Sequence, residues 1–468
     1  MKKFYITTTI PYVNAEPHLG FAMEIVQADI IARYHRLLGE DVVFNTGTDE
    51  HGIKIYRAAL EQKKDPQSYV DEYSAKFDAL KQSLNLSYTN FLRTSSPNHK
   101  KAAQEFWKLC LANGDIYKKD YKIKYCVGCE LEKTDSELEN DKCPIHPNLE
   151  IEIIEEENYF FKFSKYQKHL LDLYEKNPQF VLPDFRLKEI KEFVSKGLQD
   201  FSISRLKDKL PWGVPVFNDP KHVSYVWFDA LVCYISTLGW PDDEKKFKEY
   251  WSVVQMAGKD NLRQQSAMWQ AMLMSAGLPN SKQIIIHGFI TNAGQKMSKS
   301  LGNVIDPFEL VEKYGTDAVR FFVAHELNTF EDSDVTFERI QASYTANLAN
   351  GLGNLVARVA KLAENIEFEV TKTTEIFDPL VEEKLKEFKF NEALDAVWQD
   401  IAALDKKINQ VEPWKLEANK LEEFLSESSV KIRSIALTLS PFLPETSQKI
   451  LKQFSGKIQS APPLFPRI

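Results

Sequence analysis

The sequence predicts an α/β protein in which a doubly wound parallel sheet is interrupted by an insertion and followed by an α-helical bundle. Three observations predict this fold class: a strand–helix–strand pattern near the N-terminus, the return of that pattern after residue 250, and a change to helical periodicity from about residue 336. A strand–helix–strand order is typical of parallel strands joined by a crossover helix. The 468 residues exceed what one hydrophobic core usually organises, so several domains are expected.

The elements follow in order along the chain. The first pattern runs from FYITTTI (4–10) through the apolar helix FAMEIVQADIIARYHRLL (21–38) to DVVFNTG (41–47). The second runs from SVVQMAG (252–258) through NLRQQSAMWQAMLMSAG (261–277) to IIIHGFI (284–290). We therefore expect a Rossmann-like domain in two halves with an insertion between them, then linking helices and a helical bundle. The expected boundaries are 1–115, 116–224, 225–290, 291–335 and 336–468.

Composition and charge narrow the class of protein. The net charge of −8 argues against a histone-like protein that coats nucleic acid, but it does not exclude local basic patches. No stretch reaches the roughly 18 apolar residues of a membrane span, and the N-terminus lacks the apolar run of a signal peptide. The five cysteines are odd in number and three of them cluster, which disfavours a secreted disulfide framework. We expect a cytoplasmic protein with no membrane attachment.

The cysteine cluster has the spacing of a metal site. Cys126, Cys129, Cys143 and His146 form the pattern C-x₂-C…C-x₂-H. Two such pairs on tight turns supply four soft donors in a tetrahedron, which favours Zn²⁺. Because all four positions are filled by protein, we expect one structural zinc ion per chain; the alternative is unpaired thiols on a loop. The remaining cysteines are expected to be buried thiols.

Two short motifs carry groups suited to phosphate. EPHLGF (16–21) lies between the first predicted strand and its helix, where His18 can donate to a phosphate and Gly20 allows a nucleotide to approach the backbone. GQKMSKSLGN (294–303) places Lys296 and Lys299 on a loop between glycines, which suits a phosphate chain that must be neutralised only when substrate is present. The alternatives are a turn beside a chance histidine and a solvated basic loop.

With these motifs the sequence resembles the methionyl-tRNA synthetases among the class I aminoacyl-tRNA synthetases. HLGF and KMSKS look like the paired signatures of that class. The narrower resemblance comes from TTTIPYVNAEPHLG, GTDEHG (47–52), YVWFDA (225–230), GKD (258–260), HGF (287–289) and LGNLVAR (352–358). The resemblance implies that methionine attacks the α-phosphate of ATP, with Mg²⁺ and loss of pyrophosphate. The methionyl group then passes to the 2′-hydroxyl of the terminal adenosine of tRNA(Met).

The resemblance also implies roles for individual residues. Catalysis is expected from His18, Lys296 and Lys299, mainly by stabilising charge on the leaving pyrophosphate. ATP is expected to meet His18, Gly20, Phe21, Glu24, Gly258, His287, Gly288, Lys296 and Lys299. Methionine is expected to meet Ile10, Tyr12, Trp227, Tyr234 and Asp260, with Asp260 pairing its ammonium. Asn354, Arg358 and Trp414 are expected to bind the anticodon, by base-edge contacts and stacking. Ordinary core positions are the alternative for Trp227, Tyr234 and Trp414, and a solvated face for Arg358.

The sequence departs from the family pattern in two places, and other functions compete. Phe21 stands where the first signature usually has a second histidine, and Gln264 and Gln265 stand where many relatives have an aromatic residue and a histidine. A leucyl, isoleucyl or valyl synthetase is one alternative, but we expect the insertion to be too short for both a zinc knuckle and a large editing domain. A nucleotidylyltransferase and a zinc-containing RNA-binding module are the others. No appended dimerisation domain is recognised after the bundle, so a monomer is expected.

Overall fold

The computed structural model describes residues 1–468 except 134, 298–301, 365 and 367–376. The chain forms two compact units. The first unit comprises Met1–Glu16, Gly39–Ala79 and Tyr88–Ile286, and the second comprises Pro17–Leu38, Leu80–Ser87 and His287–Ile468. Each unit therefore contains segments that are distant in sequence. Within the described residues, no helix is both long and apolar enough to cross a membrane.

A parallel sheet forms the centre of the first unit and confirms the predicted α/β class. Its six described strands have the order β3-β2-β1-β12-β13-β7. β1 (Lys3–Thr7) pairs in parallel with both β2 (Asp41–Thr48) and β12 (Val254–Gly258), so the two halves of the pattern join along this strand. The outer strands are β3 (Asn90–Arg93), β13 (Gln283–His287) and β7 (Val181–Leu182). The strands are mostly buried, as expected for a parallel sheet between other layers.

The strand expected at 284–290 is instead divided between two sheets, so that prediction was wrong in its length. β13 ends at His287, and β14 (Ile290–Asn292) pairs with β15 (Gln295–Lys296) and β16 (Ser333–Val335) in the second unit. The break has a steric cause. Gly288 lies so close to the backbone at Glu331 that an added Cβ would stand 2.2 Å from its carbonyl oxygen, and its N–H donates to the Thr329 carbonyl at 3.0 Å.

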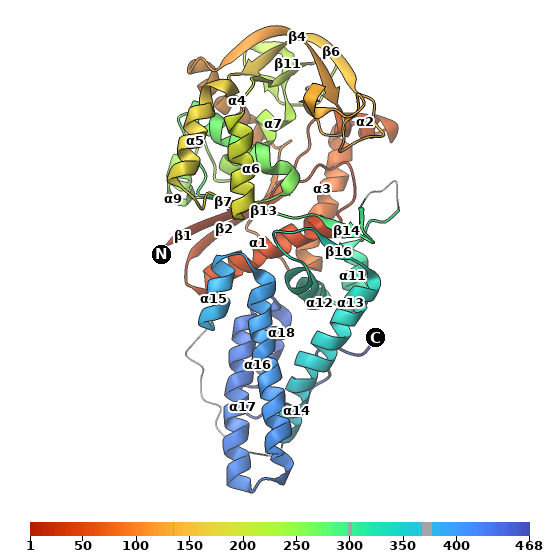
Figure 1. Cartoon of the computed structure of the whole chain (residues 1–468), viewed down its shortest axis with the longest axis vertical. Coiled ribbons are helices and arrows are strands. Elements are labelled where there is room, and N and C mark those ends of the chain that lie inside the picture. The colour runs from red at the N-terminus through yellow and green to blue at the C-terminus, as the bar shows by residue number, and fades with distance from the viewer. Residues whose placement is uncertain (134, 298–301, 365, 367–376) are drawn as a thin grey trace. The chain divides into compact units, whose positions relative to one another are not determined.

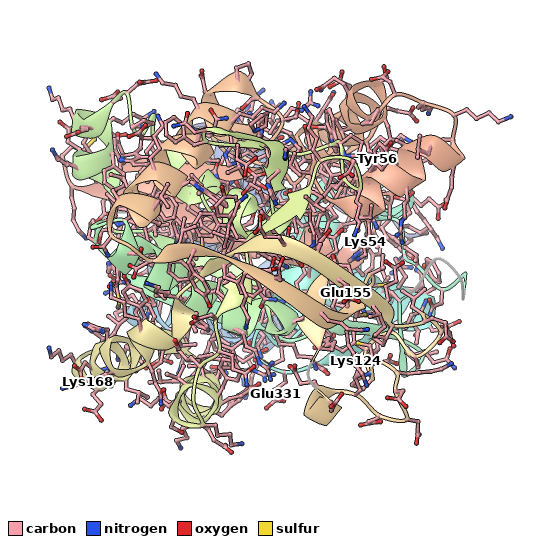
Figure 2. The ribbon with its side chains drawn as sticks, turned by 90° about the horizontal axis from the view of Figure 1, so that it is seen from above. Lys54, Tyr56, Lys124, Glu155, Lys168 and Glu331 are labelled. Atoms are coloured by element: carbon pink, nitrogen blue, oxygen red, sulfur yellow. The ribbon has the colours of Figure 1, made fainter. Side chains whose placement is uncertain are left out.

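The insertion contains antiparallel sheets of its own. The long strands β4 (Ile116–Cys126) and β6 (Glu152–Phe161) pair from Ile116 with Phe161 to Tyr125 with Glu152. β5 (Leu131–Lys133) and β8 (Phe201–Ser202) complete this sheet, and β9 (Ser204–Leu206), β10 (Pro215–Val216) and β11 (Asp219–Ser224) form a smaller one. Figure 1 shows β4 and β6 as a curved ribbon, and Figure 2 labels Lys124 and Glu155 on the same two strands.

Helices and short turns connect the strands of the first unit. The α-helices are α2 (Ile53–Glu61), α3 (Pro66–Ser83), α4 (Pro97–Ala112), α5 (Gln167–Lys176), α6 (Asp184–Ser195), α7 (Val226–Ala230), α8 (Cys233–Ser236), α9 (Glu244–Tyr250) and α10 (Trp269–Ser275). The shorter 3₁₀ turns are η1 (Asp135–Glu137), η2 (Phe163–Tyr166) and η3 (Lys259–Asn261), and η4 (Gln264–Met268) is a π-helical turn that leads into α10.

The second unit is mainly helical. Its helices are α1 (Leu19–Leu37), α11 (Pro307–Tyr314), α12 (Thr316–Phe321), α13 (Phe337–Ser343), α14 (Asn354–Ala363), α15 (Pro379–Lys386), α16 (Phe390–Val411), α17 (Ala418–Leu439) and α18 (Pro444–Gln453). Two π-helical segments, η6 (Phe322–Glu326) and η7 (Tyr344–Gly353), and the turn η8 (Pro413–Lys415) complete it. The long helices appear in blue in Figure 1 and confirm the predicted bundle. A buried ion pair, Arg320 to Asp29 at 2.8 Å, joins α12 to α1.

Candidate active site and metal centre

The residues expected to bind the amino acid lie in the first unit. Tyr12 and Trp227 pack on the same small apolar cluster and are both half-buried. Tyr234 is buried in the large core cluster, and Trp227 and Ile10 both pack against that cluster. Ile10 is half-buried and belongs to the same loop as Tyr12. The structure therefore brings the three aromatic residues into one region.

Gln265, which departs from the family pattern, contacts one of these aromatic residues directly. Its amide Nε2 donates to the Tyr234 hydroxyl at 2.7 Å, and its Oε1 accepts from Gln255 at 2.9 Å. Both Gln264 and Gln265 are buried in the π-helical turn η4. π-Helical turns frequently occur at functional sites because they turn side chains away from the regular helical positions. Gln265 therefore fixes the orientation of Tyr234.

Asp49 is a buried carboxylate beside this region and is absent from the residues predicted from the sequence. Its side chain is only 3% exposed. Its N–H donates to the Pro11 carbonyl at 2.9 Å, and its own carbonyl accepts from Val13 at 3.3 Å, so it is fixed beside Tyr12. Burial, followed by the negative charges of Asp229 and Glu130, raises the pKa of Asp49 well above its ordinary value. Such a group gains most from a nearby cation.

Asp260 differs from Asp49 in its surroundings. It lies in η3 and is exposed, and its Oδ1 accepts from the side-chain amide of Asn261 at 3.2 Å. A carboxylate in water attracts an ammonium weakly, because the solvent screens the interaction. The sequence signal that points to Asp49 instead is its motif, GTDEHG, which follows directly on a parallel strand. The carboxyl ends of parallel strands are where ligands bind in doubly wound folds.

A chain of buried polar groups supports the same loop. His51 Nδ1 lies 2.5 Å from Asp229, whose other oxygen lies 2.8 Å from His99 Nε2, and His99 Nδ1 lies 2.9 Å from the Ser236 hydroxyl. Burial alone would raise the pKa of Asp229, but His51 and His99 together hold it below its ordinary value. The chain connects the GTDEHG loop to α4, α7 and α8, and so fixes it against the helices that carry the aromatic residues.

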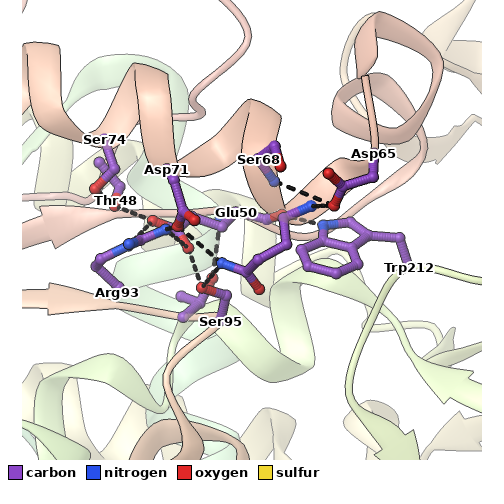
Figure 3. A network of polar contacts seen from close by, with 11 residues as sticks. Thr48, Glu50, Asp65, Ser68, Asp71, Ser74, Arg93, Ser95 and Trp212 are labelled. Atoms are coloured by element: carbon purple, nitrogen blue, oxygen red, sulfur yellow. Dashed lines mark hydrogen bonds and ion pairs between the residues drawn. The ribbon is translucent and has the colours of Figure 1, made fainter. Parts of the chain in front are cut away.

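Glu50 also anchors this loop, and Figure 3 shows the polar groups around its side chain. Its buried carboxylate pairs with Arg93 at 2.6 Å and accepts from the Thr48 hydroxyl at 2.7 Å and from the Ser95 hydroxyl. Arg93 also pairs with Asp71 at 2.5 Å. A buried carboxylate is costly unless it is paired and hydrogen-bonded, and Glu50 is both. Glu50 therefore has a structural role, and leaves its neighbours Asp49 and His51 for the site.

The four predicted metal ligands are brought together in the insertion. Among the described residues, Cys126, Cys129, Cys143 and His146 are the group whose donor atoms could hold a metal, all within 4.8 Å of one another. Cys129 Sγ lies 3.5 Å from Cys143 Sγ and 3.3 Å from His146 Nδ1. Donors around a tetrahedral zinc ion lie roughly 3.5–3.8 Å apart, given Zn–S of about 2.3 Å and Zn–N of about 2.0 Å. The donor set therefore fits a tetrahedral metal ion.

The turn that carries these four ligands requires a glycine at position 128. A Cβ on Gly128 would stand 2.4 Å from the ring of His146, so any larger residue would push that ligand away. We call residues 126–146 the knuckle. Cys110 and Cys233, predicted to be buried thiols, are both buried and lie outside this group.

Described residues of the two motifs expected to bind phosphate lie close together in the second unit. His18 caps α1, because its Nδ1 accepts from the Gly20 N–H at 3.0 Å, and the Leu19 N–H donates to the Ile305 carbonyl at 3.0 Å. A Cβ on Gly20 would lie 3.8 Å from the methyl group of Met297, the methionine of KMSKS. Gly20 of HLGF and Met297, the described methionine of KMSKS, are thus neighbours in space. Only the backbone of Lys296 is described, in β15, and Lys299 lies outside the described residues.

Other residues expected near ATP have defined places. Glu24, on α1, accepts from or shares a proton with His287, at 2.7 Å from its Nε2, and both side chains are buried. Phe21 is also buried, so the residue that replaces the signature histidine packs in the interior. Gly288 makes the close backbone approach described above. Gly258 ends β12 in the first unit.

Two of the three residues expected to read the anticodon, Arg358 and Trp414, lie near the C-terminal end of α16. Arg358 pairs with Asp405 at 2.5 Å and donates to the Asn409 side chain at 2.8 Å, both near the C-terminal end of that helix. Trp414 follows in η8 with 56% of its surface exposed, which excludes the core alternative for this residue. Asn354 is exposed one helical turn before Arg358 on α14. This end of the bundle therefore offers a plane and polar groups to solvent.

Comparisons with known proteins agree with these features. The family model "tRNA synthetases class I (M)" matches residues 4–147 and 131–360. A methionine–tRNA ligase of Thermotoga maritima is 41% identical over 97% of this chain and 75% of its own length. Another, from a Nostoc species, is 42% identical over 97% of this chain and 90% of its own.

Solved structures show the same similarity. A methionyl-tRNA synthetase of Mycobacterium tuberculosis in complex with methionyl-adenylate has a TM-score of 0.92 and 35% identity, covering 100% of both chains. The apo form of the synthetase from that organism has a TM-score of 0.84 and 32% identity, covering 100% of this chain and 98% of its own.

Proposed function

The chain belongs to the methionine–tRNA ligase family of class I aminoacyl-tRNA synthetases, and from this premise we propose that it joins methionine to tRNA(Met) in two steps. ATP first activates methionine to methionyl-adenylate, and the methionyl group then passes to the 2′-hydroxyl of the terminal adenosine. The observation that carries the proposal is the approach of Met297 to Gly20, which places both class I signatures side by side.

In the first step the second unit binds the triphosphate. His18 already uses Nδ1 in capping α1, so its other ring nitrogen is the donor for a phosphate oxygen. Gly20 lets the nucleotide approach the backbone at the start of α1. His287, whose ring is held by Glu24 at 2.7 Å, and the neighbouring Gly288 contact ATP. Lys296 and Lys299 neutralise charge on the leaving pyrophosphate, and this effect is greatest in the transition state. Mg²⁺, when bound with ATP, supplies further charge neutralisation on the phosphates.

In the amino-acid pocket, Tyr12, Trp227 and Tyr234 contact the thioether, for which aromatic rings are favourable partners. Two carboxylates are candidates for the ammonium. Asp260 was expected from the family resemblance but is exposed, whereas Asp49 is buried beside Tyr12 and next to other negative charges. Burial strengthens an ion pair, so we propose Asp49 as the principal partner and Asp260 as a weaker, peripheral one.

The knuckle holds a structural Zn²⁺ through Cys126, Cys129, Cys143 and His146. Three thiolates and one imidazole fill the tetrahedron, which leaves no position for a reacting water. In the helical bundle, Trp414 stacks on a splayed anticodon base while Asn354 and Arg358 contact base edges. We include a monomeric enzyme in the proposal. We also propose a cytoplasmic location, because no disulfide joins cysteines among the described residues.

ATP–pyrophosphate exchange with each amino acid in turn tests the proposal. We expect exchange with methionine and at most weak exchange with leucine, isoleucine or valine. Purified protein should then charge a tRNA with anticodon CAU. Exchange that depends on another amino acid would reject methionine as the substrate, and a complete lack of exchange would favour a binding protein without catalysis.

A further inference from the structure

Glu130 joins the metal knuckle to the amino-acid pocket. It follows Cys129 directly, and only 1% of its surface is exposed. Its Oε2 accepts a hydrogen bond from the hydroxyl of Tyr12, which is 118 residues away. Its Oε1 accepts from the backbone N–H of Lys54, in the first turn of α2, at 3.2 Å. One carboxylate therefore contacts the loop of Tyr12, which belongs to the predicted methionine site, and the start of the helix that follows the GTDEHG motif.

The backbone at Glu130 indicates that its side chain is needed. Its φ angle is +50°, in the left-handed region that favours glycine or asparagine. A glutamate in this conformation has backbone strain that a glycine would not have. Such strain is found most often at functional sites. Burial of the carboxylate adds a further cost. The bonds to Tyr12 and Lys54 offset these costs, and the positive charges of Lys54 and Arg205 also favour the carboxylate.

The surroundings are shaped to fit this carboxylate. Gly52, with φ of +111°, has its Cα so close that an added Cβ would lie 3.0 Å from Glu130 Oε1. The Lys54 ammonium, labelled in Figure 2, donates to the Gly128 carbonyl of the knuckle at 2.5 Å. The same ammonium lies 5.5 Å from the centre of the Tyr12 ring, within cation–π range. Tyr12 is thus held at its ring and at its hydroxyl.

Apolar packing accompanies these bonds. Val127 of the knuckle packs on the same small apolar cluster as the ring of Tyr12. A cavity of about 220 Å³ beside this cluster is lined in part by Glu130. Packing therefore holds the ring of Tyr12, whereas Glu130 accepts from its hydroxyl. Loss of the Glu130 carboxylate should therefore change the position of the Tyr12 hydroxyl.

We propose that Glu130 is a positioning residue for methionine, which holds the Tyr12 hydroxyl and the first turn of α2 from its place in the metal knuckle. The proposal rests on methionine activation as proposed above. Glu130 touches neither substrate; it acts through Tyr12, whose ring contacts the methionine side chain. The knuckle then has a second task besides its own stability, because it delivers this carboxylate to the pocket.

Exchange kinetics on E130A, E130Q and Y12F test the proposal, with E139Q as the control because Glu139 is exposed on the same knuckle. We expect E130A to raise the KM for methionine roughly tenfold to a hundredfold, the usual worth of a hydrogen bond to a charged group. The KM for ATP should change little. E130Q should rescue part of the loss, since its amide oxygen can still accept from Tyr12. E139Q should behave as the unaltered enzyme.

The double variant E130A/Y12F gives the decisive comparison. If Glu130 acts through Tyr12, the double variant should bind methionine no worse than E130A, because the same interaction is removed twice. Losses that multiply would overturn the proposal. The proposal would also be overturned if E130Q lost its metal, or if it melted early and had an impaired kcat and impaired KM values for both substrates. Glu130 would then only stabilise the knuckle. Y12F reports on the bond without altering the knuckle, and an unchanged methionine KM in Y12F would also overturn it.

Metal content and the shift of melting temperature on adding methionine are measured beside the kinetics. Both are independent of turnover. If the proposed function itself were wrong, the unaltered enzyme would show no methionine-dependent exchange. This outcome differs from every result that would reject only the role of Glu130.

Discussion

Asp49, Glu50 and His51 are consecutive acidic and basic residues, and each has a different set of partners. The Glu50 carboxylate pairs with Arg93 and accepts from hydroxyl groups, and the His51 ring is bonded to Asp229. Asp49 meets backbone groups on the loop of Tyr12 and lies among negative charges. The uneven pairing follows from their directions in the loop, because adjacent side chains of an extended segment point to opposite sides. A substrate ammonium beside Asp49 would relieve the excess negative charge.

Substitution separates the two candidate carboxylates. Asp49→Asn should raise the KM for methionine by roughly thirtyfold or more, since removing one partner of a buried charge pair costs about 2–5 kcal/mol. Asp260→Asn should raise it by less than about fivefold, as for exposed pairs. Both are measured by ATP–pyrophosphate exchange over a range of methionine concentrations. The reverse order of effects would assign the ammonium to Asp260.

The raised pKa of Asp49 predicts a pH dependence of methionine binding. A carboxyl group whose pKa is raised takes up a proton earlier as the pH falls, and the neutral form no longer attracts the ammonium. The KM for methionine should therefore increase as the pH is lowered across the range in which the enzyme stays folded, and the increase should begin at a higher pH than an ordinary aspartate would give, with a smaller change in the KM for ATP. The Asp49→Asn variant should lose most of this dependence. A methionine KM that is constant over the range would contradict the assignment.

At the scale of elements, periodicity and spacing in the sequence predicted much of the structure. β-Branched runs predicted β1, β2 and β12, and the C-x₂-C…C-x₂-H spacing predicted a ligand cluster. Spacing fails where partners are far apart in the chain. Glu130 and Tyr12 are 118 residues apart, so no local pattern shows their bond. The early end of β13 has the same origin, because the approach of Gly288 to Glu331 is invisible in either segment alone.

The knuckle should depend on its metal. Cys143→Ala removes one of the four donors, and we expect the purified variant to lose its zinc and to melt earlier. Metal binding contributes on the order of 10 kcal/mol to the folding of small zinc domains, so a lost ligand is not compensated by local packing. Metal analysis and thermal melts measure both effects. Cys110→Ala is the control, because Cys110 is buried outside the cluster and should leave the metal content unchanged. Full zinc occupancy in Cys143→Ala would reject the ligand set.

At the scale of the whole molecule, the proposed tasks fall on different parts of the chain. The amino-acid pocket and the knuckle lie in the first unit, and HLGF, KMSKS and the bundle lie in the second. The first unit also contains stretches from before and after α1, because the chain leaves it at Glu16 and returns at Gly39. Variants in different parts should therefore affect different steps, and this can be measured separately for activation and for tRNA charging.

Trp414 provides the sharpest test of that separation. Its indole is 56% exposed, so Trp414→Ala should change the free energy of unfolding by only about 0.5 kcal/mol. Loss of one base stacked on an aromatic ring costs about 1–3 kcal/mol, which is roughly tenfold to a hundredfold in tRNA recognition. Aminoacylation of a tRNA with anticodon CAU should fall accordingly, and its advantage over a tRNA with an altered anticodon should shrink. ATP–pyrophosphate exchange should hardly change.

The matched control for this prediction is Trp398→Ala in α16. The Trp398 ring is half-buried and lies 4.6 Å from the ring of Phe321, so its removal should leave a space in the bundle and lower the melting temperature. The two tryptophans thus distinguish recognition from stability within one helical region. If Trp414→Ala also melted early and lost exchange together with aminoacylation, its effect on tRNA would be a consequence of unfolding. If it charged both tRNAs as well as the unaltered enzyme does, the stacking assignment would be rejected and the anticodon would have to be read elsewhere on the bundle.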